Sequence, residues 1–393
     1  MSLVDKNALE TQAVLQDPRK ESAPTTVASK TVKLPSLPAL SKSDKLKAIE
    51  GATRSMNAEY ATQLIQKLGK KTGVRLPCLA TGMPTFDETT MSCGGVPDGR
   101  VIEVFGPESA GKTAWALHVI GMAQKAGGFA AFVDAEHALD PNFAKKLGVD
   151  VDNLVISQPD YGEQALEVVE VLIRTRAFRV IVIDSVSALV PKAELEGDMG
   201  DSHMGLQARL MSQAMRKLVG LAATNGVTLI FINQIREKIG VVFGNPEVTT
   251  GGRALKFWSS VRLEVRRLSN TDGGQIKDDA GVHIGHRMKI KNVKNKVGPP
   301  FRETIVNLMY ETGFDLRSDV IEYAQQVGAV IVGDQTKEDV KEGTGNGVPK
   351  GWFGFKGENY RKLDLTIDPL FDNLKVEAMA RRDARLAEAQ AEA

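Results

Sequence analysis

Short apolar runs rich in β-branched residues alternate with longer stretches of helical periodicity along the middle of the chain. Five such runs predict strands, at residues 101–105, 129–133, 154–157, 180–183 and 227–232, the first of them buried. The helical patterns between them are clearest at residues 114–120, 162–175 and 203–224. This alternation predicts an α/β fold with a mostly parallel, twisted sheet flanked by helices. In such sheets ligands bind beyond the carboxyl ends of the strands.

The pattern changes on both sides of this region. Residues 1–43 are polar and interrupted by prolines, which predicts a disordered tail. Residues 44–69 carry apolar side chains at helical spacing, which predicts an amphipathic helix, followed by a linker to residue 74. Periodicity alone favours packing of this helix on the chain's own core over packing on a neighbouring subunit. The predicted core spans residues 75–312, and a C-terminal domain ending in an Ala-rich helix spans residues 313–393.

Composition narrows the class of protein only a little. The formal net charge of +1 neither supports nor excludes a nucleic-acid partner, since a neutral protein can carry a basic groove. The two cysteines, Cys78 and Cys93, are too few for a disulfide framework and lack zinc-site spacing. No apolar run approaches the length needed to span a membrane, and the N-terminus lacks a signal-peptide core. We therefore expect a soluble, cytoplasmic protein without a membrane partner.

A phosphate-binding motif follows the first predicted strand. The octapeptide fits G-x-x-x-x-G-K-[ST], and its residues are Gly106, Pro107, Glu108, Ser109, Ala110, Gly111, Lys112 and Thr113. A strand before the loop and a helix after it are the context in which this pattern cradles phosphate. Lys112 is expected to reach the β- and γ-phosphates, and the Thr113 hydroxyl to hold Mg²⁺.

Three further polar side chains follow predicted strands. Asp184 ends the run 180–183 and is the second expected Mg²⁺ residue, the alternative being a cap for the next helix. Glu136 follows the run 129–133 and is the expected base for an attacking water, chosen over Asp134, which lies nearer the buried strand. Gln234 follows the run 227–232, where a neutral amide can contact a γ-phosphate.

Two long loops are candidates for binding single-stranded nucleic acid. Residues 235–252 combine Arg236 and Lys238 with four apolar residues, a mixture suited to base stacking beside phosphate contacts. A loop without function would not explain so many apolar side chains in one run. Residues 194–205 form the second candidate loop, with Met204 near its end and Ser212 and Arg216 on the following helix.

Several of these stretches together resemble the bacterial RecA recombinase family. The resemblance rests on GPESAGKT at 106–113, DAEHALDP at 134–141, residues 157–160 and 162–166, GDSHMGL at 200–206, FINQIR at 231–236, residues 238–240, FGNPE at 243–247 and KNK at 294–296. It is close over residues 96–302, looser over 44–95 and weak after about residue 315.

The resemblance implies a RecA-like P-loop ATPase core with an N-terminal helix and a small C-terminal α/β domain. It implies a DNA-dependent ATPase that uses ATP and Mg²⁺, forms helical homo-oligomeric filaments on single-stranded DNA and exchanges strands with homologous duplex DNA. It also implies that the helix at 44–69 packs on the next subunit, which reverses the preference from periodicity. Whether a self-cleaving repressor or filament loaders are further partners stays open.

The resemblance also assigns roles to single residues. Glu136 becomes the catalytic carboxylate, Gln234 the γ-phosphate sensor, and Lys294 and Lys296 the lysines that reach a neighbouring subunit's γ-phosphate. Asp140 is assigned to the adenine amine, and Phe143 stands where the family commonly has a tyrosine over the adenine. The assigned DNA contacts are Met204, Ser212, Arg216, Arg236, Ile239, Gly251, Gly252 and Arg253. Phe257 corresponds to an aromatic residue of the subunit interface.

Two departures and two alternatives qualify this interpretation. The region after residue 315 keeps only traces of the family pattern, and residues 371–393 are near neutral where the family has an acidic tail. The first alternative is another RecA-like motor, either a helicase or a RadA-like branch-migration protein, although the four-cysteine zinc pattern of RadA is absent from the sequence. The second is a filament regulator without turnover, which the intact Lys112, Thr113, Glu136 and Asp184 disfavour.

Overall fold

The structure is a computed structural model that describes residues 41–60, 76–198, 205–237, 244, 246–334 and 346–391. The chain forms two compact units, Met1–Gly73 and Val74–Ala393. In the first unit, helix α1 (Lys42–Glu59) begins at Ser41, whose hydroxyl accepts a hydrogen bond from the Asp44 amide at 3.2 Å. No residue of α1 is buried, and Ile49 is 54% exposed. The predicted helix is confirmed here, and the rest of its predicted length, from residue 61, lies outside the described residues.

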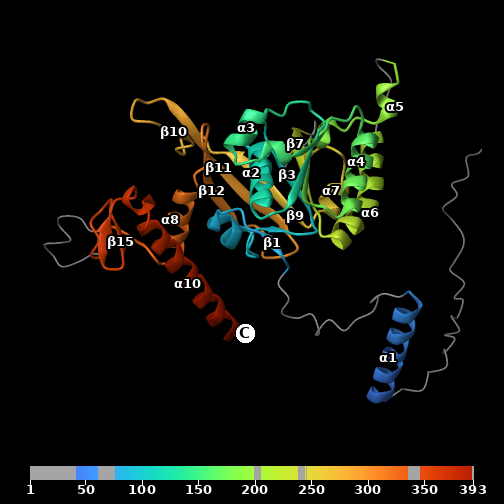
Figure 1. Cartoon of the computed structure of the whole chain (residues 1–393), viewed down its shortest axis with the longest axis horizontal. Helices are drawn as coiled ribbons and strands as arrows, with labels where there is room; N and C mark the ends of the chain where they lie inside the picture. Colours follow the sequence, from blue (N-terminus) through green and yellow to red (C-terminus); the bar gives the residue numbers. More distant parts are fainter. Residues whose placement is uncertain are drawn as a thin grey trace, which may run out of the picture. The chain divides into compact units, whose positions relative to one another are not determined.

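A large mixed sheet organises the second unit (Figure 1). Within the described residues its strands follow the order β13-β12-β11-β9-β3-β7-β6-β4-β5, with β10 beside β11 and β8 beside β7. The neighbours from β9 to β5 pair in parallel, and all other pairs are antiparallel. The strands are β3 (Val101–Gly106), β4 (Phe129–Asp134), β5 (Val155–Ser157), β6 (Phe178–Asp184), β7 (Thr228–Glu237), β8 (Glu247–Thr249), β9 (Val261–Arg267), β10 (Gln275–Lys277), β11 (His283–Asn295), β12 (Glu303–Met309) and β13 (Gly313–Phe314).

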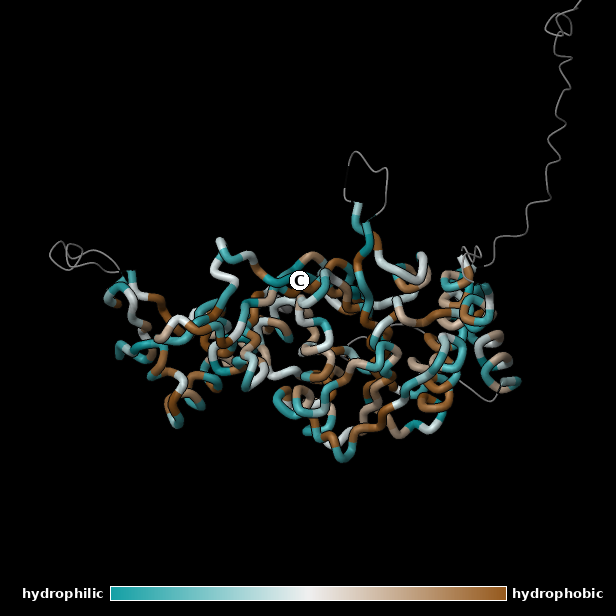
Figure 2. Tube along the Cα trace, turned by 90° about the horizontal axis from the view of Figure 1, so that it is seen from above, coloured by the Kyte–Doolittle hydropathy of each residue, from teal (hydrophilic) through white to brown (hydrophobic). Residues whose placement is uncertain are grey.

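Helices cover both faces of the parallel part, because its strands are apolar on both sides. On β6, Val180 and Val182 pack in the cluster that contains α2 (Lys112–Lys125), whereas Ile181 and Ile183 pack in the cluster that contains α4 (Gly162–Thr175) and α6 (Leu206–Asn225). Figure 2 shows hydrophobic and hydrophilic residues mixed along the helices of the structure, as expected of elements with one buried face. The five predicted strands and the layered α/β architecture are therefore confirmed.

Shorter elements connect these layers. They are β1 (Cys78–Leu79), the π-helix η2 (Thr85–Thr90), β2 (Val96–Pro97), α3 (Pro141–Lys146), η3 (Val151–Asn153), η4 (Val186–Ala188), α5 (Lys192–Leu195) and α7 (Ala254–Trp258). The first residues of the predicted loop 194–205 belong to α5, and residues 199–204 lie outside the described part. The predicted loop 235–252 is a strand pair at its base, since Ile235 is aligned with Thr249 and Glu237 with Glu247.

The C-terminal region builds a small α/β layer of its own. It contains α8 (Leu316–Gln326), β14 (Ile331–Val332), β15 (Phe353–Phe355), β16 (Glu358–Tyr360), η5 (Asp364–Thr366) and α10 (Leu370–Ala391). Ile321, Leu365 and Leu374 are fully buried in its separate apolar cluster. The expected helices and strands of the C-terminal region are present with their own apolar cluster, within the same compact unit as the large sheet. In the described part of the chain, no helix is long and apolar enough to cross a bilayer.

Candidate nucleotide site and DNA-loop roots

The phosphate-binding loop leaves the carboxyl end of β3 and enters α2. Both fixed glycines are required by close packing and backbone conformation. A Cβ on Gly106 would lie 1.9 Å from the Val265 carbonyl oxygen of the adjacent strand. Gly111 has a φ of +93°, and a Cβ there would lie 2.6 Å from the Met288 sulfur. The loop can therefore pass close to β9 and β11 and present its N–H groups at the start of α2, an arrangement suited to phosphate.

Lys112 is the first residue of α2 and is buried. Its ammonium donates a hydrogen bond to the Pro107 carbonyl at 2.6 Å, so the side chain folds back over the loop. Burial lowers the pKa of Lys112, while the nearby carboxylates of Asp184, Glu136 and Glu108 oppose that shift. The lysine is thus held where it can contact phosphates cradled by the loop.

The side-chain oxygens of Thr113, on α2, and Asp184, at the end of β6, lie next to each other. The Thr113 hydroxyl donates to Asp184 Oδ2 at 2.7 Å. Burial raises the pKa of Asp184 to about 6, the negative charge of Glu136 adds to the rise, and the hydrogen bond from Thr113 opposes it. A hydroxyl and a carboxylate fit Mg²⁺, which commonly takes few protein ligands and keeps water and substrate phosphates. In the described part of the chain, no group of three or more His, Cys, Asp or Glu residues is placed to hold a metal ion.

The structure separates the two carboxylates that follow β4. Asp134 is only 2% exposed and accepts hydrogen bonds from the Ala138 amide at 3.1 Å and the Leu139 amide at 3.3 Å. Glu136 is exposed at the sheet edge. Asp134 therefore organises the turn after the strand, and Glu136 is the carboxylate available to a substrate water.

Glu136 lies beside the amide predicted to sense phosphate. Gln234 Nε2 donates to Glu136 Oε1 at 3.0 Å, and the Ser185 hydroxyl also donates to Glu136. Ser185 is 2.5 Å from the Ser187 hydroxyl. The carboxyl ends of β3, β4, β6 and β7 therefore bring the P-loop, Asp184, Glu136 and Gln234 together at one end of the sheet.

Phe143 lies on α3, and Asp140 is the residue immediately before this helix. Asp140 caps this helix by accepting a hydrogen bond from the Asn142 amide at 2.8 Å, and its carboxyl group is exposed. Phe143 is half-buried and packs against the apolar cluster on the α2 face of the sheet. Neither position conflicts with a role in holding a base.

Two of the described candidates for DNA contact, Gly251 and Gly252, lie against the first turn of α6. Gly251 N donates to Gln207 Oε1 at 3.2 Å, and a Cβ on Gly252 would lie 2.7 Å from the Ala208 Cβ. Ser212 and Arg216 follow Ala208 at four-residue steps, so they share one face of α6. Arg253 is exposed at the start of α7, and Arg236 is exposed on β7. The ends of both predicted DNA loops therefore meet here, while Met204 and Ile239 lie outside the described residues.

Lys294, Lys296 and Phe257 lie at the other end of the sheet. Lys294 on β11 is aligned with Arg262 of β9, and Arg262 is aligned with Glu103 near the start of β3. The P-loop follows the end of β3, so Lys294 lies toward the other end of the sheet. The Lys296 amide donates to the Ser260 carbonyl, one step further from the P-loop. The Lys294 ammonium donates to the carbonyls of Lys256 at 2.7 Å and Phe257 at 3.0 Å. Phe257 is 69% exposed.

Comparison with known proteins identifies the family. A family model described as the RecA N-terminal domain matches residues 47–315. The chain belongs to the RecA family. Protein RecA of Clostridium tetani is 45% identical to this RecA-family chain over 357 residues, covering 88% of the chain and 99% of the relative. Protein RecA of Clostridioides difficile is 54% identical over 287 residues, covering 73% and 80%, and that of Bifidobacterium longum is 53% identical over 283 residues, covering 72% and 70%.

Membership of the RecA family confirms the resemblance seen in the motifs. It places the chain among recombinases that act in recombination and DNA repair, and it supports a DNA-dependent ATPase in general terms. Nothing in the comparisons favours the RadA-like or helicase alternative.

One polar network of this RecA-family chain is absent from the motif-based predictions. Asn233 is fully buried, and its Nδ2 donates to Glu103 Oε1 at 2.9 Å and to the Thr250 carbonyl at 3.1 Å. Glu103 is also paired with Arg262 at 2.5 Å. The network therefore joins the P-loop strand, the strand that carries Gln234, and the end of the loop 235–252. A charged residue inside the apolar run 101–105 was the sequence signal that could have revealed it.

Proposed function

We propose that this chain is a DNA-dependent ATPase that forms helical filaments on single-stranded DNA and pairs it with a homologous duplex, with ATP bound at the seam between subunits. The observation that carries the proposal is the division of phosphate-directed residues between two ends of one sheet. The P-loop, Glu136 and Gln234 lie at one end, and Lys294 and Lys296 lie at the other. A lysine so far from its own P-loop can serve the γ-phosphate of another copy.

The residues at the first end have complementary roles. The loop amides and Lys112 hold the phosphates, and Thr113 and Asp184 hold Mg²⁺, which supplies charge neutralisation when bound. Glu136 orients the attacking water and accepts its proton. In the structure the amide of Gln234 donates to Glu136, so a phosphate that draws this amide away would also free the carboxylate.

The second end supports an oligomer seam. Phe257 is 69% exposed and Trp258 is 41% exposed, and both follow directly from the segment that carries Gly251–Arg253. The ammonium of Lys294 binds the carbonyl of Phe257, so a phosphate that attracts this lysine from a neighbouring copy perturbs α7 directly. This connection supports the coupling of ATP binding at the seam to the DNA loops.

The DNA-facing surface consists of Arg216, Arg236 and Arg253 near the two glycines that precede α7. Positive side chains and backbone amides contact phosphate without selecting sequence, which leaves the bases free for pairing. Met204 and Ile239 remain predicted contacts, the latter as an apolar wedge between base steps. We also infer that the protein works in the cytoplasm, where its nucleotide and DNA partners are present.

Mixing two inactive variants tests the seam. Lys112→Ala lacks the P-loop lysine and Lys294→Ala lacks the lysine of the opposite end, so each should lose DNA-stimulated ATP hydrolysis alone. In an equal mixture about a quarter of the seams combine an intact P-loop with an intact Lys294, and hydrolysis should return to about that fraction of the wild-type rate. Lys291→Ala, on the same strand, is the matched control and should remain active.

Two results would overturn the proposal. A mixture that stays inactive while both variants still bind single-stranded DNA would show that the lysine does not act across a seam. Hydrolysis by Lys294→Ala at the wild-type rate would remove the lysine from the reaction.

A further inference from the structure

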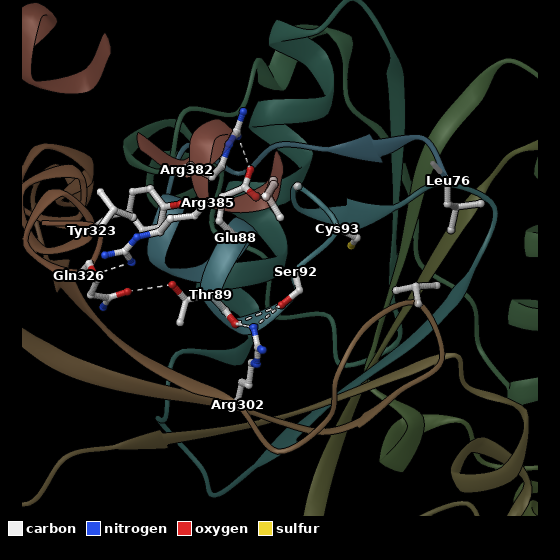
Figure 3. A pocket seen from close by; sticks show the side chains of 14 residues that line it. Leu76, Glu88, Thr89, Ser92, Cys93, Arg302, Tyr323, Gln326, Arg382 and Arg385 are labelled. Carbon is white, nitrogen blue, oxygen red and sulfur yellow. Dashed lines mark hydrogen bonds and ion pairs between the residues drawn. The ribbon is translucent and has the colours of Figure 1, made fainter. Parts of the chain in front are cut away.

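A large cavity lies between the ATPase core and the C-terminal layer, away from the P-loop (Figure 3). Its volume is about 780 Å³, within the range of small-molecule sites. The core side supplies Glu88, Thr89 and Ser92 from η2 and the turn after it, together with Arg302 ahead of β12. The other wall comes from α8 and α10, chiefly Tyr323, Gln326, Arg382 and Arg385.

Hydrogen bonds tie the two walls together and hold the cavity in shape. Arg382 on α10 pairs with Glu88 at 2.7 Å, and the Thr89 hydroxyl donates to Gln326 Oε1 at 2.8 Å (Figure 3). Deeper in the same junction, the Thr85 amide donates to Asp319 of α8 at 3.1 Å. These contacts cross from core to C-terminal layer, so the cavity is a built feature and not a gap between loose surfaces.

The cavity has two guanidinium groups whose charge is not balanced by the wall. Arg302 Nη1 donates to the Ser92 hydroxyl at 2.7 Å and the Thr89 carbonyl at 3.3 Å. Arg385 Nη1 donates to the Gln326 carbonyl at 3.1 Å. These hydrogen-bond acceptors are neutral, and within the described residues neither arginine forms an ion pair with a carboxylate. Arg382 pairs with both Glu88 and Asp383, at 2.7 Å from each, so Arg302 and Arg385 are the arginines of the lining without a carboxylate partner among the described residues.

The rest of the lining is apolar. Leu76, Cys93 and Val297 from the core face Val327 and Leu386 from the C-terminal layer. A cavity lined by two arginines with neutral hydrogen-bond acceptors and by an apolar wall matches a ligand with a doubly charged oxyanion and an apolar body. A phosphate monoester carries about two negative charges at neutral pH and accepts bidentate hydrogen bonds from guanidinium groups.

We propose that this cavity binds a small phosphate monoester of nucleoside-monophosphate type, with the phosphate between Arg302 and Arg385 and the apolar body against Val297, Val327 and Leu386. Such a ligand bridges core and C-terminal layer, so its binding fastens the two together.

Cys93 gives a local readout, because it lines the cavity and the chain has only one other cysteine. In a Cys78→Ser background, the rate at which a disulfide reagent modifies Cys93 reports access to the cavity. Adenosine 5′-monophosphate should slow this reaction saturably, and adenosine should not. The same protection should appear in Lys112→Ala, since the P-loop is not involved.

Matched arginine variants test the phosphate contact. Arg385→Gln removes a charge-assisted contact and should weaken protection about 10- to 100-fold. Arg381→Gln is the control, because Arg381 lies one turn earlier on α10 and also donates to a carbonyl at the end of α8, that of Gly328, but does not line this cavity. In Arg381→Gln, adenosine 5′-monophosphate should protect Cys93 as strongly as in the parent protein.

Several outcomes would overturn the assignment. Protection of Cys93 by adenosine or by inorganic phosphate that is as strong as protection by adenosine 5′-monophosphate would refute the site. So would a monophosphate that gives no saturable protection of Cys93, or an equal loss of protection in Arg385→Gln and Arg381→Gln. Protection by a short DNA duplex but not by the monophosphate would instead make this surface a DNA contact, and would also refute the proposal.

Discussion

Replacing Asn233 with alanine should destabilise the core more than any single exposed change, because Asn233 is fully buried and satisfies four polar groups. Its side-chain NH₂ group donates to Glu103 and to the Thr250 carbonyl. Its side-chain oxygen accepts from the backbone N–H of Gln234 at 2.9 Å and from the Thr250 hydroxyl at 2.5 Å. A hydrogen bond to a charged group contributes about 1.5–3 kcal/mol and each neutral one about 1 kcal/mol. Allowing for relaxation, we expect a loss of about 3–5 kcal/mol in the free energy of unfolding.

Urea unfolding followed by circular dichroism measures this loss. Asn225→Ala is the control, because Asn225 makes one hydrogen bond, to the Leu221 carbonyl at 2.9 Å, at the end of α6, and should cost about 1 kcal/mol or less. At temperatures where Asn233→Ala is still folded, hydrolysis should respond less to single-stranded DNA, since Asn233 joins Gln234 to Thr250. Equal unfolding midpoints for the two variants would refute the view that this network holds the strands together.

Three further predictions concern charge and backbone conformation. Burial raises the pKa of Asp184 to about 6, so protons compete with Mg²⁺ below that pH. The Mg²⁺ affinity measured by calorimetry should therefore fall about tenfold per pH unit below about pH 6. Asp184→Asn should remove this pH dependence and weaken Mg²⁺ binding at every pH. Burial also raises the pKa of Asp319 to about 7, above its unfolded value. The stability that comes from its bound proton is therefore present at low pH and is lost as the pH rises from about 4 through about 7. In Asp319→Asn the urea midpoint should no longer depend on pH across that window, and an unchanged pH dependence would contradict the assignment. Gly251→Ala should lower stability by about 2 kcal/mol, since its Cβ would lie 2.8 Å from the Val186 Cγ1 at a φ of +75°, whereas Gly127→Ala, at +79° with open space around it, should cost only about 1 kcal/mol.

Local patterns were enough to predict the parallel part of the fold and one end of the site. Strands buried on both faces have continuous apolar runs, and a polar residue just after such a run lies at the ligand-binding edge. Asp184 and Glu136 could be chosen in this way, because each follows a predicted strand, whereas Lys112 and Thr113 were chosen from the G-x-x-x-x-G-K-[ST] motif. The preference for Glu136 over Asp134 also followed from nearness to the strand, and the burial of Asp134 agrees with it.

Features that depend on pairing between distant segments required the tertiary structure. Strands β9, β11 and β12 alternate buried and less buried residues, which is a weaker local signal than a continuous apolar run. Only the register of β11, β9 and β3 shows that Lys294 lies at the other end of the sheet from the chain's own P-loop. The Asn233 network and the cavity between η2 and α10 combine residues more than a hundred positions apart, so no local spacing encodes them. By itself the sequence determined which short segments form the parallel strands and which loop carries the phosphate-binding motif, because those properties depend on neighbours along the chain. Only the folded sheet decided which side chains share an edge, since that depends on strand order and register.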